Sequence, residues 1–312
     1  MATRAALGLA ADPVLVALPP AGSDRQYWRV ILPDGNHCIA SRHEGKRAEN
    51  RNFAALARVL ATRGVRVPRI LAEDVSARLL WLEDLGDDSL QRLLNDPVRQ
   101  QQAAISAVGE VARLHSLAFD PELSALAQAP FDATLYRWEQ DYFFDHLAVT
   151  HLGMPPDVVA ACRKHPALRD VADTLAALPR VPVHRDFQSQ NILLQADGRA
   201  ALIDFQGLRA GLAEYDLASL FHDPYTDMSP ALAEYLFLHY HQVRGTDAGA
   251  SRARLQACAI QRLMQALGAY ANLAHNLGKP QYLDFIPVAI DRLRKVVNGH
   301  PVEQALAPVL EK

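Results

Sequence analysis

Apolar and polar residues follow a mainly β-type pattern over residues 22–85 of the chain. The segments YWRVIL (27–32) and HCIAS (37–41) flank the tetrapeptide PDGN, whose Asp-Gly pair favours a tight turn. This arrangement predicts a β-hairpin. The segment RLLWLEDL (78–85) is an almost continuous apolar run, which is typical of a buried strand.

Helical spacing appears once within this part and then dominates the rest of the chain. Residues 49–63 predict a helix that Gly64 closes, because apolar side chains recur at a spacing of three and four residues. The apolar positions of this helix are Phe53, Leu56, Ala57 and Leu60. Further amphipathic helices are predicted over 99–118, 252–275 and 281–297. The stripe of the first of these consists of Ile105, Val108, Val111, Ala112 and His115.

The change from one pattern to the other lies near Gly86, Asp87 and Asp88. We therefore expect two lobes. Residues 1–85 form a small β-rich lobe, and residues 86–312 form a larger, mainly helical lobe, which is an α+β organisation.

A second hairpin is predicted around Asp197-Gly198, a dipeptide that favours a two-residue loop. With such a loop, Ile192 faces Ile203 and Asn191 faces Asp204. Directly opposed residues have their Cβ atoms about 4.5–5.5 Å apart. The count therefore predicts that Asn191 and Asp204 can share one hard cation, such as Mg²⁺, at the open end of the hairpin.

Composition argues against several classes of protein. The chain has 312 residues, half of them hydrophobic, and a formal net charge of −3, so no global positive charge points to nucleic acid. No uninterrupted apolar stretch is long enough to span a membrane. The N-terminal segment carries Asp12 and a Pro pair, which argues against a signal peptide. We therefore expect a cytoplasmic protein whose three widely spaced cysteines are reduced.

The chemistry is concentrated in the segment VHRDFQSQNILLQADGRAALIDFQ, residues 183–206. His184, Asp186 and Asn191 show the spacing H-x-D-x-x-x-x-N, and Asp204 follows within I-D-F. This is the base-and-magnesium arrangement of a kinase catalytic loop. A carboxylate at the position of Asp186 suits a base that orients an incoming hydroxyl and accepts its proton.

These motifs resemble the aminoglycoside phosphotransferase and choline kinase-like superfamily, which has a protein-kinase-like fold. The blocks HRDFQSQNIL and LIDFQGLRAGLAEYDLASLFHD carry the resemblance. Within the superfamily the chain is most similar to the cell-wall-recycling kinases that phosphorylate N-acetylmuramate and N-acetylglucosamine at the anomeric hydroxyl. The blocks behind this closer resemblance are GSDRQYWRV, AEN, LEDLGDDSL, DFQ and QRLMQALGAYANLAHNLGKPQYLDFIP.

The resemblance implies ATP and Mg²⁺ as cofactors and a role for each matched residue. Asp186 is the implied catalytic base, and Asn191 and Asp204 are the implied magnesium ligands. His184 is expected to be structural, hydrogen-bonding near the metal-binding Asp. Asp216 lies where a helix begins, and we expect it to accept backbone hydrogen bonds from the catalytic loop.

Residues of the N-terminal part are implied in nucleotide binding. Gly22, Ser23 and Asp24 resemble a phosphate-covering loop, since glycine lets backbone N–H groups approach phosphate, although an ordinary turn explains them as well. Glu83 and Leu85 flank a hinge where adenine pairs with the backbone.

The phosphate-pairing lysine of kinases is missing from this part of the chain. Arg42 and the more distant Lys46 are the candidate cations in its place. Glu49 is a candidate partner for such a cation, although a solvent-exposed Glu in the first turn of a helix explains it as well. Gln206 stands where kinases carry the Gly of D-F-G. The resembling sugar kinases share both departures.

Gln261 and Arg262 are the candidate sugar contacts, and an ordinary surface Arg is an equal alternative. An acidic pocket for an aminoglycoside or another aminoalcohol stays open, with Glu214, Asp223 and Asp227 as its acids. A non-catalytic pseudokinase is the alternative from another class. A protein kinase is disfavoured, because only 12 positions separate Asp204 from Asp216 and no A-P-E follows.

Overall fold

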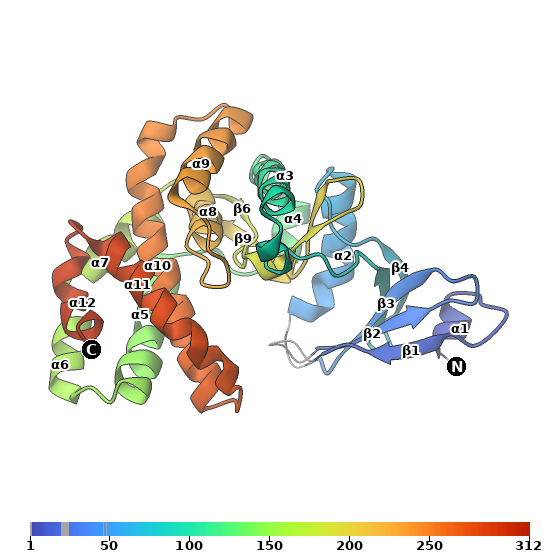
Figure 1. The fold of residues 1–312 in the computed structure, drawn as a ribbon, viewed down its shortest axis with the longest axis horizontal. Coiled ribbons are helices and arrows are strands. Elements are labelled where there is room, and N and C mark those ends of the chain that lie inside the picture. The colour runs from blue at the N-terminus through green and yellow to red at the C-terminus, as the bar shows by residue number, and fades with distance from the viewer. Residues whose placement is uncertain (1, 20–24, 46, 48) are drawn as a thin grey trace. The chain divides into compact units, whose positions relative to one another are not determined.

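The structure is a computed structural model that describes residues 2–19, 25–45, 47 and 49–312 (Figure 1). The chain divides into two compact units. The first unit consists of Met1–Gln128 and Asn191–Leu208, and the second of Ala129–Gln190 and Arg209–Lys312. The predicted α+β fold class is confirmed, with a β-sheet in the N-terminal region and a mainly helical remainder. The lobe boundary expected at residue 85 stays a prediction.

The first unit is built on a five-stranded antiparallel sheet in the order β1-β2-β3-β5-β4 (Figure 1). Its strands are β1 (Val14–Ala17), β2 (Arg25–Ile31), β3 (His37–His43), β4 (Ile70–Asp74) and β5 (Leu79–Glu83). The predicted hairpin is confirmed as β2 and β3, and the apolar run 78–85 is confirmed as β5. Trp81 of β5 is fully buried in a small core against Val30 and Cys38.

The helices of the first unit include two that the sequence predicts, over 49–63 and 99–118. In chain order the helices are α1 (Ala2–Ala6), α2 (Glu49–Thr62), η1 (Arg92–Asn95), α3 (Pro97–His115), α4 (Pro121–Leu126) and η4 (Phe205–Gly207). The predicted α2 is confirmed with its apolar stripe buried, and Gly64 follows it in the left-handed conformation. Helix α3 starts two residues earlier than predicted, because the Asp96 side chain accepts a hydrogen bond from the Arg99 N–H and Pro97 fits the first helical position.

The predicted second hairpin exists, but its register differs by one residue. Strands β7 (Ile192–Leu194) and β8 (Ala200–Leu202) pair so that Ile192 faces Leu202. Asn191 therefore lies opposite Ile203, whose N–H donates to the Asn191 carbonyl oxygen at 3.0 Å. The predicted pairing of Asn191 with Asp204 is wrong.

The loop explains the shift. A two-residue type I′ loop needs positive φ at both Asp197 and Gly198, but of the two only Gly198 has it, at 81°. Gln195 instead pairs with Arg199 across a three-residue loop, and the Asp197 carboxylate accepts a hydrogen bond from the Arg199 N–H. The β2–β3 loop has the same form, with Asp34 bonded to the Asn36 N–H and Gly35 at φ 83°.

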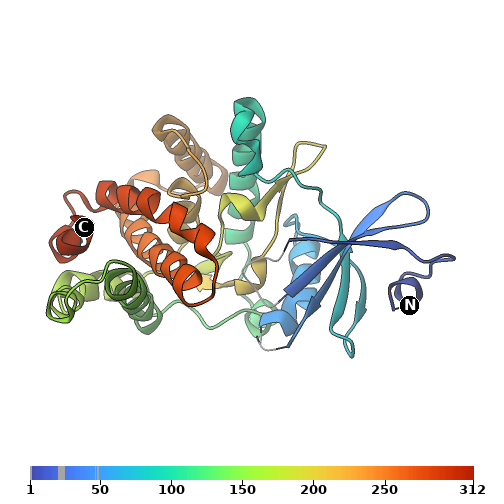
Figure 2. The same cartoon turned by 60° about the horizontal axis from the view of Figure 1, so that its bottom comes forward.

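The second unit is a helical assembly with one short antiparallel pair, β6 (Val181–Val183) and β9 (Arg209–Gly211) (Figure 2). Its helices in chain order are α5 (Ala133–Phe143), η2 (Phe144–His151), α6 (Pro156–Arg163), α7 (Pro166–Ala177), η3 (Ser189–Asn191, whose last residue belongs to the first unit), α8 (Ala213–Phe221), α9 (Pro230–Arg244), α10 (Ala248–His275), η5 (Pro280–Phe285), α11 (Ile286–Val297) and α12 (Val302–Leu310). The helices predicted over 252–275 and 281–297 correspond to α10 and α11. The first turn of the latter prediction is the 3₁₀-helix η5 instead.

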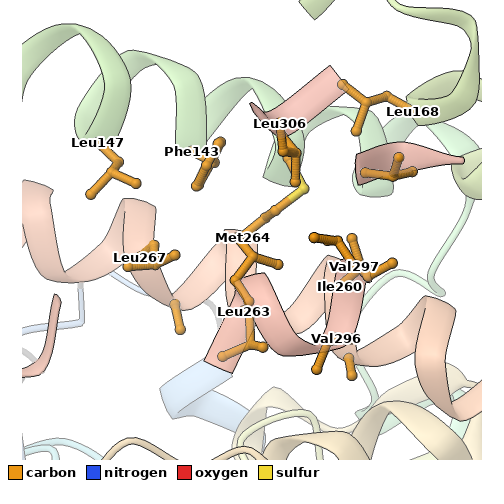
Figure 3. Packing of buried hydrophobic residues seen from close by; sticks show 14 of the residues in the cluster. Phe143, Leu147, Leu168, Ile260, Leu263, Met264, Leu267, Val296, Val297 and Leu306 are labelled. Atoms are coloured by element: carbon orange, nitrogen blue, oxygen red, sulfur yellow. The ribbon is translucent and has the colours of Figure 1, made fainter. Parts of the chain in front are cut away.

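Helix α10 is the centre of the second unit's core (Figure 3). Figure 3 shows Leu263, Met264 and Leu267 of α10 among side chains of α5, α7, α11 and α12. Gly268 lets α10 approach α5 closely, because a Cβ atom there would lie 2.9 Å from the Tyr142 carbonyl oxygen. The helix that carries Gln261 and Arg262 is thus fixed firmly within its unit.

Two predictions from composition can be compared with the structure. Cys38, Cys162 and Cys258 are all buried and form no disulfide. Among the helices of the described residues, none combines the length and the hydropathy that a membrane span requires.

Candidate active site

The segment 184–189 of the second unit is held through its main chain by two buried aspartates. Asp216, in the first turn of α8, accepts hydrogen bonds from the main-chain N–H groups of His184 and Arg185 at 2.6 and 2.8 Å. Asp223, just beyond the end of α8, accepts one from the N–H of Ser189 at 2.6 Å. The predicted anchoring role of Asp216 is confirmed. The similar role of Asp223 was not predicted.

His184 itself is fully buried, with its ring packed near Phe187. This placement fits the expected structural role. The expected hydrogen bond of its ring near the metal-binding Asp stays a prediction.

Asp186 lies inside this anchored segment and is surrounded by positive charge. Its carboxylate oxygens are 3.6 Å from an Arg185 Nη atom and 3.8 Å from an Arg262 Nη atom. Burial alone would raise the pKa of Asp186, but the charges of Arg185, Arg262 and His184 outweigh it and hold the pKa below its ordinary value. Asp186 is therefore ionised at neutral pH, as a proton acceptor must be.

The two candidate sugar contacts on α10 differ in their surroundings. Arg262 reaches the segment 184–189, where it lies beside Asp186 and donates to the Gln188 side chain at 3.3 Å. It also donates to the Ser219 hydroxyl of α8 at 3.2 Å. Gln261 is fully buried and points elsewhere. Only Arg262 is placed next to a predicted catalytic group.

Both the nitrogen and the oxygen of the Gln261 side-chain amide form hydrogen bonds. It donates to the Tyr136 carbonyl at 2.8 Å and to Glu139 at 3.1 Å, and it accepts from Gln140 at 3.1 Å. Burial raises the pKa of Glu139, although its hydrogen bonds with Gln261 and Tyr215 offset part of this effect. These contacts favour a supporting role for Gln261 within the core.

In the first unit, Asp204 follows β8 in a left-handed conformation, with φ 62° and ψ 31°. Such a backbone is uncommon for a non-glycine residue and is often found at functional sites. Its Oδ1 accepts hydrogen bonds from Arg25 at 2.8 Å and from the Gln206 side chain at 2.7 Å. Within the described part of the chain, no residue donates to Oδ2.

The donor set suits a magnesium–nucleotide complex better than a free metal ion. Asn191 and Asp204, on adjoining strand ends of the first unit, offer hard oxygen ligands, which Mg²⁺ prefers. Over the residues that the structure describes, no group of three or more His, Cys, Asp or Glu side chains is placed to hold a metal. Mg²⁺ usually takes only one or two protein ligands and completes its shell with phosphates and water.

The structure describes only some of the residues that are predicted to contact the nucleotide. Gly22, Ser23, Asp24 and Lys46 lie outside the described residues. Arg42 is exposed on β3. The cation that the structure places beside Asp204 is Arg25, which is 7% exposed. The sequence analysis missed it, although Arg25 directly follows the predicted phosphate loop.

The predicted hinge residues are engaged within the first unit. Glu83 forms a two-pronged ion pair with Arg66, at 2.8 and 2.9 Å. The Leu85 carbonyl accepts a hydrogen bond from the Gln195 side chain at 2.9 Å. Glu49 lies 3.5 Å from Arg47 and contributes to the negative potential at Arg25. The adenine-binding role of Glu83 and Leu85 stays a prediction.

Comparison with known proteins agrees with this arrangement. The N-acetylmuramate/N-acetylglucosamine kinase of Pseudomonas aeruginosa is 27% identical over 94% of this chain and 87% of its own length. The protein of the same name from Caulobacter vibrioides is 31% identical over 75% of this chain and 67% of its own length. Among solved structures, a choline/ethanolamine kinase family protein from Mesorhizobium loti has a TM-score of 0.66 at 16% identity, covering 98% of this chain and 94% of that one.

The chain also matches a family description. Residues 16–258, most of the chain, match the family described as "Phosphotransferase enzyme family". This range includes Asp186, Asn191 and Asp204, together with Asp216 and Asp223. The chain belongs to the phosphotransferase enzyme family.

Proposed function

We propose that this protein is an ATP- and Mg²⁺-dependent kinase that phosphorylates the anomeric hydroxyl of N-acetylmuramate, N-acetylglucosamine or both. The observation that carries the proposal is Asp186, a carboxylate beside two arginines in a segment anchored at both ends by buried aspartates. The names of the relatives support the choice of sugar. The proposed reaction takes place in the cytoplasm, where ATP is supplied.

In this proposal Asp186 is the general base. The acceptor hydroxyl oxygen forms a bond to the γ-phosphorus of ATP, while the bond from that phosphorus to the β–γ bridging oxygen breaks. Asp186 orients the hydroxyl and takes its proton, and ADP leaves with the electron pair of the broken bond. A hemiacetal hydroxyl is more acidic than an ordinary alcohol, so a carboxylate with a low pKa suffices as its base.

Asn191 and Asp204 are the proposed ligands of the magnesium ion. Bound Mg²⁺ would offset the negative charge of the phosphates and help to align them. The Oδ2 of Asp204, to which no described residue donates, and the amide oxygen of Asn191 are the atoms that would supply this binding.

Arg262 is the proposed contact for the acceptor. Its guanidinium lies beside Asp186, and a cation suits the lactyl carboxylate of N-acetylmuramate. Gln261 supports this proposal only indirectly, by bracing the same helix against Glu139.

An aminoglycoside or aminoalcohol acceptor fits less well. A polycationic substrate calls for uncompensated acids. Glu214 is paired with Arg254 at 2.7 Å and bonded to the Ser251 hydroxyl at 2.6 Å. The Asp223 carboxylate accepts main-chain hydrogen bonds, and Asp227 is the exposed acid of the three.

The direct test incubates the protein with Mg²⁺, ATP and each sugar in turn, and locates the phosphate by phosphorus–proton coupling in the product. We expect phosphate on the anomeric carbon. A phosphate on carbon six, or turnover with aminoglycosides alone, would overturn the proposed acceptor and leave a kinase. Nucleotide binding without any product would favour the pseudokinase alternative.

A further inference from the structure

The residue that replaces the Gly of D-F-G makes specific contacts in the first unit. The Gln206 side chain is buried between two charged groups. Its Nε2 donates to Asp204 Oδ1 at 2.7 Å, and its Oε1 accepts from Arg25 Nη1 at 3.2 Å. Arg25 closes the triangle by donating from Nη2 to Asp204 Oδ1 at 2.8 Å. We call Arg25 and Gln206 the Asp204 clamp.

The members of the clamp are buried and packed as well as hydrogen-bonded. The Arg25 guanidinium lies 5.9 Å from the centre of the Phe53 ring, on helix α2. The Phe53 ring stacks on Phe205 at 4.8 Å, and Phe205 joins Asp204 to Gln206 in the chain. Both clamp side chains therefore reach Asp204 from fixed positions.

The two clamp bonds end on the same carboxylate oxygen. Oδ1 receives both donors, whereas no described residue donates to Oδ2. Contacts that served only to compensate a buried charge would tend to use both oxygens, as Asp216 does with two main-chain N–H groups. The clamp instead fixes the plane of the carboxylate and leaves one oxygen, with 39% of the side chain exposed, available to a cation.

We infer that Gln206 and Arg25 are positioning residues that orient Asp204 toward magnesium, so that the Gln of D-F-Q takes part in metal binding through its neighbour. The inference rests on the proposed function, in which Asp204 is a magnesium ligand. Residues that hydrogen-bond a metal ligand from outside fix its orientation, and their loss typically weakens metal affinity about 10- to 100-fold.

Three single variants of the full-length protein test this inference. Gln206→Leu keeps the buried volume and removes both hydrogen bonds of the amide. Arg25→Lys keeps the positive charge beside Asp204 but replaces the planar fork, whose two Nη atoms reach Asp204 and Gln206, by one nitrogen without that fixed geometry. Arg63→Met is the matched control, because Arg63 also pairs with two carboxylates of the first unit, Asp120 and Glu122, yet does not contact Asp204.

The readout is binding of a fluorescent ATP analogue as Mg²⁺ is titrated, with thermal melting recorded for every variant. We expect Gln206→Leu to raise the half-saturating Mg²⁺ concentration about 10- to 100-fold. Arg25→Lys should give a smaller rise, and Arg63→Met none. Nucleotide binding without Mg²⁺ should not change. If Arg25→Lys does not fold, Gln206→Leu decides the question alone, because it leaves the Arg25–Asp204 ion pair in place.

A folded Gln206→Leu protein whose Mg²⁺ curve matches the wild type would overturn the inference, and so would an equal shift in Arg63→Met. Wild-type protein that binds the analogue without any dependence on Mg²⁺ is a different result. It would contradict the proposed magnesium requirement itself, and the clamp would lose its proposed purpose with it.

Discussion

The two aspartates at the centre of the proposed chemistry are held in opposite ways. In the second unit, the segment that contains Asp186 is anchored through its main chain, whose N–H groups donate hydrogen bonds to Asp216 and Asp223. In the first unit, Asp204 is anchored through its own carboxylate by the side chains of Arg25 and Gln206. The first arrangement fixes a backbone whatever side chain it carries, and the second fixes one carboxylate.

This difference suits the two proposed tasks. A base must accept a proton and release it later. The arginines at 3.6 and 3.8 Å from the carboxylate stabilise its charge without the short hydrogen bonds that would occupy its oxygens. A metal ligand must present one oxygen in one direction, so direct hydrogen bonds to the other oxygen help it. Substitutions at the two sites should therefore fail in different ways.

The largest effect should come from Asp186→Asn. The change is isosteric and removes the proton acceptor, so turnover should fall by about 10²- to 10⁴-fold. Melting temperature and ATP binding should stay close to the wild type, because the anchors of the segment contact its main chain. A variant that retained more than a few per cent of turnover would show that Asp186 is not the base.

The main-chain anchor should matter most for stability. Asp216→Ala leaves two N–H groups of the segment without their acceptor, and each such loss costs about 1–3 kcal/mol, so the free energy of unfolding should fall by about 2–6 kcal/mol. Denaturant melts measure this loss. The control is Asp173→Ala, which removes an exposed pair with Arg137 and should cost about 0–1 kcal/mol. Equal losses in both variants would contradict the anchoring role.

Asn191 and Asp204 should behave as partners. Each change to Ala should raise the Mg²⁺ requirement for turnover, and their double-mutant cycle should give a coupling free energy of about 0.5–3 kcal/mol. The expected coupling does not depend on direct opposition in the hairpin, because the left-handed Asp204 is no longer part of the regular strand. Additive effects would place the two residues in separate roles.

The loops of the two hairpins offer a smaller, cleaner test of the register. Gly198→Ala and Gly35→Ala should each lower the free energy of unfolding by about 1–2 kcal/mol, since both glycines are left-handed. Gly198→Ala should cost slightly more, because its new Cβ would lie 2.6 Å from the flexible Gln102 amide, whereas Gly35 has open space. A two-residue loop would predict that Asp197→Gly relieves backbone strain and raises the free energy of unfolding. We expect no such gain, because Asp197 is not left-handed.

The smallest effect concerns pH. The pKa of Asp186 lies below its ordinary value because nearby positive charges outweigh its burial, so activity should be lost only as pH falls through that lowered pKa. Arg262→Gln removes one of these charges, and the acid limb of kcat/KM should move to higher pH. A limb that stayed in place would mean that another group titrates there.

The sequence was most informative where chemistry and short-range pattern coincide. The spacing of His184, Asp186, Asn191 and Asp204 predicts a catalytic segment, a role that stays a prediction. The apolar periods predicted β5, α2 and α10 closely. The hairpin register was wrong by one residue, because loop length depends on the φ angle of Asp197, which the dipeptide Asp-Gly does not fix.

Local sequence patterns could not predict contacts between residues that lie far apart in the chain. Arg25 meets Asp204 across 179 positions of chain, and no motif joins the two. Gln261 and Arg262 are neighbours on α10, yet one is locked in the core and the other reaches Asp186, since the packing of α5 and α8 around that helix decides which way each faces. Asp223 was grouped with pocket acids for the same reason.

Two left-handed residues, Arg185 and Asp204, carry a lesson for anyone who wishes to engineer this protein. Each holds a backbone conformation that costs a non-glycine residue about 1–2 kcal/mol, and each adjoins or provides a group with a proposed role in the reaction. A search for heat-resistant variants would be drawn to glycine at these positions, because the backbone would relax there. Glycine at these positions would raise stability at the expense of activity. Both residues should therefore be left unchanged.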